Sequence, residues 1–339
     1  MTDFLTSILN WIQSFVGNYG WSIVLFTVLI RVVLLPLDYK NRKGMRKMQK
    51  FQPELNKLQQ KYANDKAKLQ QKQAELMKRE KYNPMSGCLP LLIQMPILFA
   101  MFAAMRQIAN EQTVRQVFEY LQGNTPEFEG WLWVRNIWTT DSPFSAAAPS
   151  VDSLRIITFD VWQKVYSTLS AGAQADIISN ISSAVESFQG TFDLSTAEAF
   201  KTSLPLIQET LIQMPNYQSA LATVPGWSNL NFFITTLSIF RQYNGLMILP
   251  ILAGVSQVFM TKMNPATAAP AQQGANNPAG GGFMKYFFPI FSVYICLSSN
   301  AGFALYWVVA NVFATLSGML LSAYLEKKDG ETVQLNEVK

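Results

Sequence analysis

The sequence has little charge, no histidine and almost no cysteine. Only 14% of its 339 residues are charged and 49% are hydrophobic, whereas about 25% of the residues of a soluble domain are charged. The absence of histidine removes the commonest general base and metal ligand. The two cysteines, Cys88 and Cys296, are too few and too far apart for a disulfide framework or a CxxC site. These shortages predict an integral membrane protein that is no enzyme and holds no metal or cofactor.

Long apolar segments take the place of the missing charge. A helix needs about 20 apolar residues to cross about 30 Å of hydrocarbon. The 40 residues from Tyr286 to Leu325 carry no charge, and "SSNAG" at 298–302 divides them into a short and a longer segment. The predicted fold is therefore all-α, an integral membrane protein with five transmembrane helices, at residues 21–37, 85–108, 245–262, 285–299 and 300–325.

The distribution of basic residues predicts the orientation. Residues 38–83 contain 14 Lys and Arg against 5 Asp and Glu, a net charge of +9, while residues 109–244 contain 6 against 12, a net charge of −6. Basic loops stay on the cytoplasmic side. We therefore expect segment 38–84 to be cytoplasmic, segment 109–244 extracytoplasmic, the N-terminus outside, and the tail 326–339 inside.

The two charged segments are expected to be helical. Apolar residues three and four apart predict a basic helical hairpin within 38–84, with a turn at "ANDK", 63–66. This hairpin is either a solvated charged face beside anionic lipid or a docking arm for a ribosome, a targeting receptor or an incoming chain. Segment 109–244 predicts a small, mainly helical domain, with Ser195 and Glu198 as a capping box.

The remaining segments are short. Residues 1–20 have one apolar face with Trp11 and predict an amphipathic helix in the membrane interface; a plain start to the first span is the alternative. Residues 263–284 are rich in Ala, Pro, Gly and Gln and predict a flexible cytoplasmic linker.

The spans contain a few polar residues whose placement in hydrocarbon needs a reason. Arg31 lies in the first span, and arginine at a helix centre costs about 2.5–3.5 kcal/mol on insertion scales. One interpretation is that Arg31 extends its head group to the membrane surface, and that each amide makes an interhelical hydrogen bond. The other is a hydrated cavity lined from several spans. The candidate residues for the lining of this cavity are Thr27, Arg31, Gln94, Gln257, Trp307 and Asn311. All have polar side chains except the tryptophan.

Several motifs resemble the YidC family of membrane-protein insertases. They are "NYGWSIVLFTVLIRVVLLPLDYK", "FQPELNKLQQKY" in the basic hairpin, "YNPMSGCLPLLIQMPILFAMF" and "NAGFALYWVVANVF", in the family's order. The resemblance implies a hydrophilic groove, open to cytoplasm and lipid, that accepts nascent chains without a cofactor. It places the groove arginine on Arg31, the polar position of the third span on Gln257, and the tryptophan of the last span on Trp307. The long 109–244 segment departs from the short bacterial members.

The predicted function is therefore that of an insertase that moves polar ends of client proteins outward and releases their apolar helices into lipid. Its expected partners are nascent membrane proteins and anionic lipids, with the ribosome, the signal recognition particle receptor and the Sec translocon as further candidates and no specific nucleic-acid sequence. The expected location is a bacterial plasma membrane. The alternative is a small-solute or ion transporter or channel, which a selective flux through liposomes would reveal.

Overall fold

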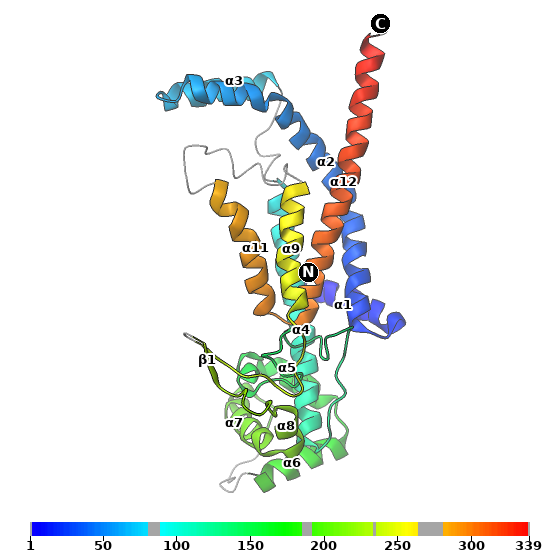
Figure 1. Cartoon of the computed structure of the whole chain (residues 1–339). Helices are drawn as coiled ribbons and strands as arrows, with labels where there is room; N and C mark the ends of the chain where they lie inside the picture. Colours follow the sequence, from blue (N-terminus) through cyan, green and yellow to red (C-terminus); the bar gives the residue numbers. More distant parts are fainter. Residues whose placement is uncertain (1, 81–88, 185–191, 233–234, 264–280, 338–339) are drawn as a thin grey trace. The chain divides into compact units, whose positions relative to one another are not determined.

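The computed structural model describes residues 2–80, 89–184, 192–232, 235–263 and 281–337 (Figure 1). Predicted positions 81–88, in the end of the hairpin and the start of the second span, and most of the predicted linker, 264–280, lie outside these residues. The chain forms two compact units. The first comprises Met1–Val24, Met101–Ile251 and Val293–Tyr306, and the second comprises Leu25–Ala100, Leu252–Ser292 and Trp307–Lys339.

The described residues are mostly helical, as predicted. The helices before the large insertion are α1 (Thr2–Val16), α2 (Tyr19–Lys61), α3 (Lys66–Arg79) and α4 (Leu89–Leu121). The insertion contains the 3-10 helix η2 (Val151–Ile156) and the helices α5 (Phe159–Ser167), α6 (Ala171–Ala184), α7 (Ala197–Gln213) and α8 (Pro215–Ala220). The last helices are α9 (Ile248–Met263), α11 (Gly281–Leu297) and α12 (Ala301–Glu337).

Two helices are long and apolar enough to cross a membrane by length and composition, over Tyr19–Gly44 and Ala301–Lys328. Two shorter apolar helices cover Ile248–Met263 and Tyr286–Leu297. The helix α2 continues without interruption past Pro36 and Pro53 to Lys61, so the first apolar segment and the first arm of the basic hairpin are one helix. Likewise α4 continues to Leu121, well beyond the predicted end of the second span at residue 108.

The insertion has its own hydrophobic core. Figure 1 shows α5–α8 gathered around the C-terminal part of α4. Val117 and Phe118 of α4 pack with Trp162 of α5 and Ile207 of α7 in one buried cluster. The Phe118 and Trp162 rings meet edge to face, 5.5 Å between centroids. These buried apolar side chains form the core of a small helical domain.

Two details of the insertion differ from the predictions. Residues Leu230–Phe232 (β1) and Thr235–Leu237 (β2) form an antiparallel pair, which an all-α fold does not contain. The N-cap of α7 is Thr196, not Ser195 as the predicted capping box required: the Thr196 side chain accepts from the Ala199 amide at 3.2 Å. Ser195 is instead bonded to Asp193, through its amide and its hydroxyl.

Candidate functional site

An amide cluster joins α9 and α12 in the second unit. Asn311 of α12 donates through its single side-chain nitrogen to the Ser256 hydroxyl at 3.1 Å and to Gln257 Oε1 at 3.2 Å. Gln257 and Asn311 are 7% and 8% exposed. Gln257 and Asn311 are both among the candidate residues predicted from the sequence, whereas Ser256 is not. It lies beside Gln257 on the helix, and only the partner helix reveals its role.

A polar stripe runs along α2. Its members are spaced about one or two turns apart, so they lie near one face of the helix: Thr27, Arg31, Asp38, Arg42 and Arg46. Thr27 is fully buried and Arg31 is half-buried. The stripe contacts α12 toward its C-terminal end. Arg42 Nη2 lies 3.5 Å from the Ala314 carbonyl oxygen, and Arg46 Nη2 lies 3.1 Å from Glu326 Oε1.

Arg31 has a carboxylate within electrostatic reach. The nearest carboxylate along the helix is that of Asp38, seven residues later on the stripe, and it interacts electrostatically with both Arg31 and Arg42. A carboxylate two helical turns away lowers the free-energy cost of placing the guanidinium in apolar surroundings.

The other candidate residues take different places. Trp307 is half-buried on α12, one turn before Asn311. Gln94 belongs to α4, but its side chain lies outside the described residues. The structure thus brings Gln257 and Asn311 together and sets Thr27 and Arg31 on one face of α2, while the common cavity remains a prediction.

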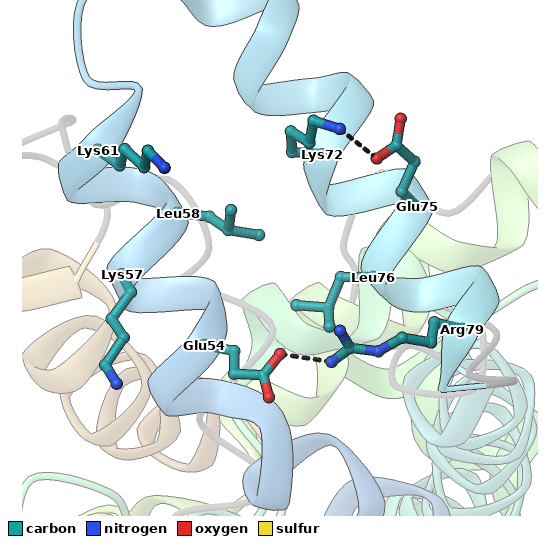
Figure 2. A pocket seen from close by; sticks show the side chains of 8 residues that line it. All are labelled: Glu54, Lys57, Leu58, Lys61, Lys72, Glu75, Leu76 and Arg79. Atoms are coloured by element: carbon teal, nitrogen blue, oxygen red, sulfur yellow. Dashed lines mark hydrogen bonds and ion pairs between the residues drawn. The ribbon is translucent and has the colours of Figure 1, made fainter.

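The basic hairpin of α2 and α3 encloses a cleft of about 400 Å³. Figure 2 shows Leu58 and Leu76 pointing toward each other across it, with Arg79 of α3 reaching Glu54 of α2. That ion pair is 2.5 Å long, and Lys72 pairs with Glu75 at 2.6 Å. The lining is completed by Lys57 and Lys61, so the cationic side chains outnumber the carboxylates.

The side chains of these sites can recognise another molecule through hydrogen bonds, charge and apolar contact. The described residues contain no group of three His, Cys, Asp or Glu side chains that could hold a metal ion. The amide cluster offers hydrogen bonds, the α2 stripe offers positive charge, and the hairpin cleft offers both charge and a small apolar floor.

Comparison with known proteins identifies relatives of this chain in sequence. The sequence profile of the 60Kd inner membrane protein family matches residues 11–185 and 195–328. The chain is 44% identical over 135 residues to the membrane protein insertase YidC of Fusobacterium nucleatum subsp. nucleatum, covering 40% of this chain and 58% of the relative. It is 38% identical over 173 residues to YidC of Clostridium perfringens, covering 47% and 66%. It is 53% identical over 95 residues to YidC of Xanthomonas oryzae pv. oryzae, covering 28% and 17%. The chain therefore spans less than two thirds of these relatives.

Proposed function

The chain belongs to the 60Kd inner membrane protein family, the family of the YidC insertases, and from that premise we propose that it inserts client proteins into the cell membrane. Members are multi-pass helical proteins, so this chain is an integral protein of that membrane. The observation that carries the proposal is the set of polar side chains within its apolar helices: the α2 stripe and the buried amide cluster of α9 and α12.

The proposed topology has five spans, with α1 in the outer interface, the N-terminus outside and the α2–α3 hairpin in the cytoplasm. The charge balance of the two large segments supports this orientation. Exposed aromatic residues on α1, Phe4, Trp11 and Phe15, support its place at the interface, because aromatic side chains favour the head-group region. Leu9 and Ile12, buried on α1, would hold this helix to the protein.

The proposed mechanism is electrostatic. Thr27, Arg31, Gln94, Gln257, Trp307 and Asn311 would line a groove that water enters from the cytoplasm. Arg31 would attract an acidic side chain of the client and guide it partway across. An ion pair at about 4 Å is worth about 4 kcal/mol at an effective dielectric constant near 20, which is comparable with the cost of about 2.5–3.5 kcal/mol for an aspartate at a helix centre. Transient pairing with Arg31 therefore offsets that cost, and the apolar client helix leaves sideways into lipid.

The proposed partners follow from the hairpin and the groove. Nascent membrane proteins would enter the groove, and the basic hairpin would face anionic lipid and dock a ribosome, the signal recognition particle receptor or the Sec translocon. The hairpin's excess of positive charge supports such contacts. Its binding would be sensitive to salt and independent of nucleic-acid sequence.

The test is insertion of a small client with an acidic translocated end into proteoliposomes, measured by protease protection. We expect Arg31→Ala to slow insertion by roughly tenfold, corresponding to about 1.4 kcal/mol, and Arg31→Lys to restore most of the rate. Arg155→Ala, which removes an exposed arginine of the insertion, is the matched control. A client whose acidic residues are replaced by amides should be indifferent to Arg31→Ala. Normal insertion of the acidic client by Arg31→Ala would refute the mechanism.

A second measurement locates the client. Photo-crosslinking residues placed at positions 31, 257 and 307 should capture a membrane protein during its synthesis, whereas position 178, exposed on α6 of the insertion, should not. Equal capture from all four positions would contradict a groove.

A further inference from the structure

One loop of the insertion, residues 129–142, contacts the first residues of three apolar helices. We call it the capping loop. It lies in the first unit together with the starts of α2, α9 and α12. The first N–H groups of any helix have no partner within that helix, and hydrocarbon supplies none. The capping loop supplies such partners from side chains and carbonyl groups.

Glu129 caps α2. Its Oε1 accepts from the backbone amide of Tyr19 and from Asn18 Nδ2, each at 3.0 Å. The loop also packs tightly on this helix: a Cβ on Gly20 would lie only 2.2 Å from the Trp131 side chain. The negative carboxylate faces the positive end of the helix dipole, which is the favourable sign.

Asp141 caps α9. This fully buried carboxylate accepts from the backbone amides of Leu246 (2.8 Å), Met247 (3.2 Å) and Leu249 (2.7 Å). Trp133 donates its indole N–H to the same carboxylate at 3.2 Å. Met247 has a φ of 62°, a conformation that costs a side-chain-bearing residue about 1–2 kcal/mol. The hydrogen bonds around it hold the backbone in that conformation.

The approach of Asp141 depends on the residue before the α9 turn. A Cβ on Gly245 would lie 2.0 Å from Asp141 Oδ1, so only glycine leaves room for the carboxylate. Buried Asn244 locks the same turn to the loop: its Oδ1 accepts from the Asn136 amide at 2.7 Å, and its Nδ2 donates to the Thr140 carbonyl oxygen at 2.9 Å.

Carbonyl groups of the same loop accept hydrogen bonds from the first backbone amides of α12. The Ala301 amide donates to the Thr139 carbonyl oxygen at 2.8 Å, and the Gly302 amide donates to the Ile137 carbonyl oxygen at 2.9 Å. The Thr140 hydroxyl donates to the Ser299 carbonyl oxygen at 3.0 Å. Three helices that are separate in sequence thus begin at one loop.

The polar residues of these helices lie at similar distances from their starts. Arg31 is 12 residues after Tyr19, Gln257 is 9 after Ile248, and Asn311 is 10 after Ala301. At about 1.5 Å per residue, each lies roughly 14–18 Å along its own helix, about half of a hydrocarbon core about 30 Å thick. A slip of one residue would move such a side chain by about 1.5 Å and turn it by about 100°.

We propose that the capping loop fixes the helical register of α2, α9 and α12, with Glu129 and Asp141 as its positioning residues. This rests on the proposed function in one respect only: the register then decides which side chains face a client. The positioning itself is a property of the protein without a client. It gives the 109–244 insertion a specific role in positioning these helices.

The experiment measures register by cysteine cross-linking in purified protein in liposomes, with Cys88 and Cys296 replaced by alanine. The pair Gln257→Cys with Asn311→Cys reports the native register, because these side chains are in contact. The pair Val258→Cys with Asn311→Cys reports a shift of one residue. We expect Asp141→Asn to lower the ratio of the first cross-linking yield to the second at least threefold. Asp176→Asn, at an exposed aspartate of α6, should leave it unchanged.

Two further variants complete the test. Gly245→Ala places a Cβ in the space that the Asp141 carboxylate occupies, so it displaces the carboxylate and should lower the same ratio. Asp141→Glu keeps the charge but lengthens the side chain, and it replaces Asp141→Asn if that variant is not recovered folded. A ratio unchanged by these substitutions would overturn the proposal. If the ratio falls while Asp141→Asn and Arg31→Ala both insert acidic clients normally, the positioning role stands and the proposed insertase mechanism fails.

Discussion

Asn311 Nδ2 lies 3.2 Å from Gln257 Oε1, and both side chains are more than nine-tenths buried between α9 and α12. If one partner is removed, the other amide stays buried and its desolvation penalty is no longer offset by a hydrogen bond. This pair therefore connects two apolar helices at one position along their length. The same amide groups could also form hydrogen bonds with water.

Replacing Asn311 tests the strength of that tie. We expect Asn311→Ala to lower the free energy of unfolding by about 0.6 kcal/mol, the average for interhelical hydrogen bonds in a membrane, and by no more than about 2. Thermal unfolding in lipid nanodiscs measures the change. Thr315→Ala is the control, because the Thr315 hydroxyl donates to the carbonyl oxygen of Asn311 on its own helix. An equal loss in both variants would count against an interhelical role.

The ion pair of Arg46 and Glu326 should be weak but specific. Arg46 Nη2 and Glu326 Oε1 lie 3.1 Å apart. The Arg46 side chain is 21% exposed and the Glu326 side chain is 71% exposed, so solvent screens the pair. We expect Glu326→Arg to destabilise the protein by about 0.2–1 kcal/mol, the range of exposed pairs, and the added change Arg46→Glu to restore most of it. A double-mutant cycle of unfolding free energies measures the coupling. A coupling of zero would show that the contact adds nothing.

The α2–α3 hairpin should depend on its apolar contact more than on its charges. Leu76 is 5% exposed and packs with Phe51 and Leu55, whereas Arg79 is largely exposed in its pair with Glu54. We expect Leu76→Asp to detach α3 and to speed hydrogen exchange of residues 66–79 by tenfold or more, since about 2 kcal/mol or more of packing is lost. Gln70→Asp, at an exposed position, and Arg79→Ala should change exchange by less than about fivefold. The reverse order would mean that charge holds the hairpin.

The insertion should lose stability at alkaline pH. Burial raises the pKa of Tyr120 to about 12 and also raises the pKa of Tyr217. Above about pH 10 an unfolded tyrosine loses its proton, while these two keep theirs when folded. The stability present below pH 10 is therefore lost as the pH rises toward 12, by about 1.4 kcal/mol per pH unit for each tyrosine. Tryptophan fluorescence of the unfolding transition measures this slope.

Tyr120→Phe separates the tyrosine effect from general alkaline damage. Within the described part of the chain, the Tyr120 hydroxyl is buried and has no hydrogen-bond partner. Its removal should therefore be neutral or stabilising at pH 7 and should reduce the alkaline slope, whereas Tyr62→Phe in the hairpin should do neither. An unchanged slope in Tyr120→Phe would show that this residue titrates normally.

Local patterns predicted much of this molecule because they depend on neighbouring residues. Apolar runs predicted the helical segments, and the isolated Arg31 and the amides Gln257 and Asn311 drew attention to the α2 stripe and the amide cluster. The cap of α7 was misplaced by one residue, since serine and threonine both cap helices and the sequence does not show that Ser195 is bonded to Asp193 instead.

The capping loop was missed for a different reason. Asp141 and Leu249 are 108 residues apart in sequence, and Glu129 and Tyr19 are 110 apart. No periodicity connects residues at that separation. Gly245 was only the first residue of the predicted third span, 245–262, and nothing in its local sequence indicated the close approach of Asp141. The sequence does contain Asp141 and, about a hundred residues later, an Asn-Gly turn before an apolar segment. These features can be connected only once the chain is folded.

The long separation between Glu129 and Tyr19 also sets an order of events during biogenesis. A ribosome that adds about 5–20 residues per second needs roughly 6–20 s to make the 110 residues between them. In the proposed topology, the first span would lie in the bilayer without its cap for that time. A further 108 residues must be made after Asp141 before its partner Leu249 exists. In the proposed topology, the outer ends of the spans are joined only after the insertion has been exported and folded, so the protein would complete its own membrane assembly from the far side of the membrane.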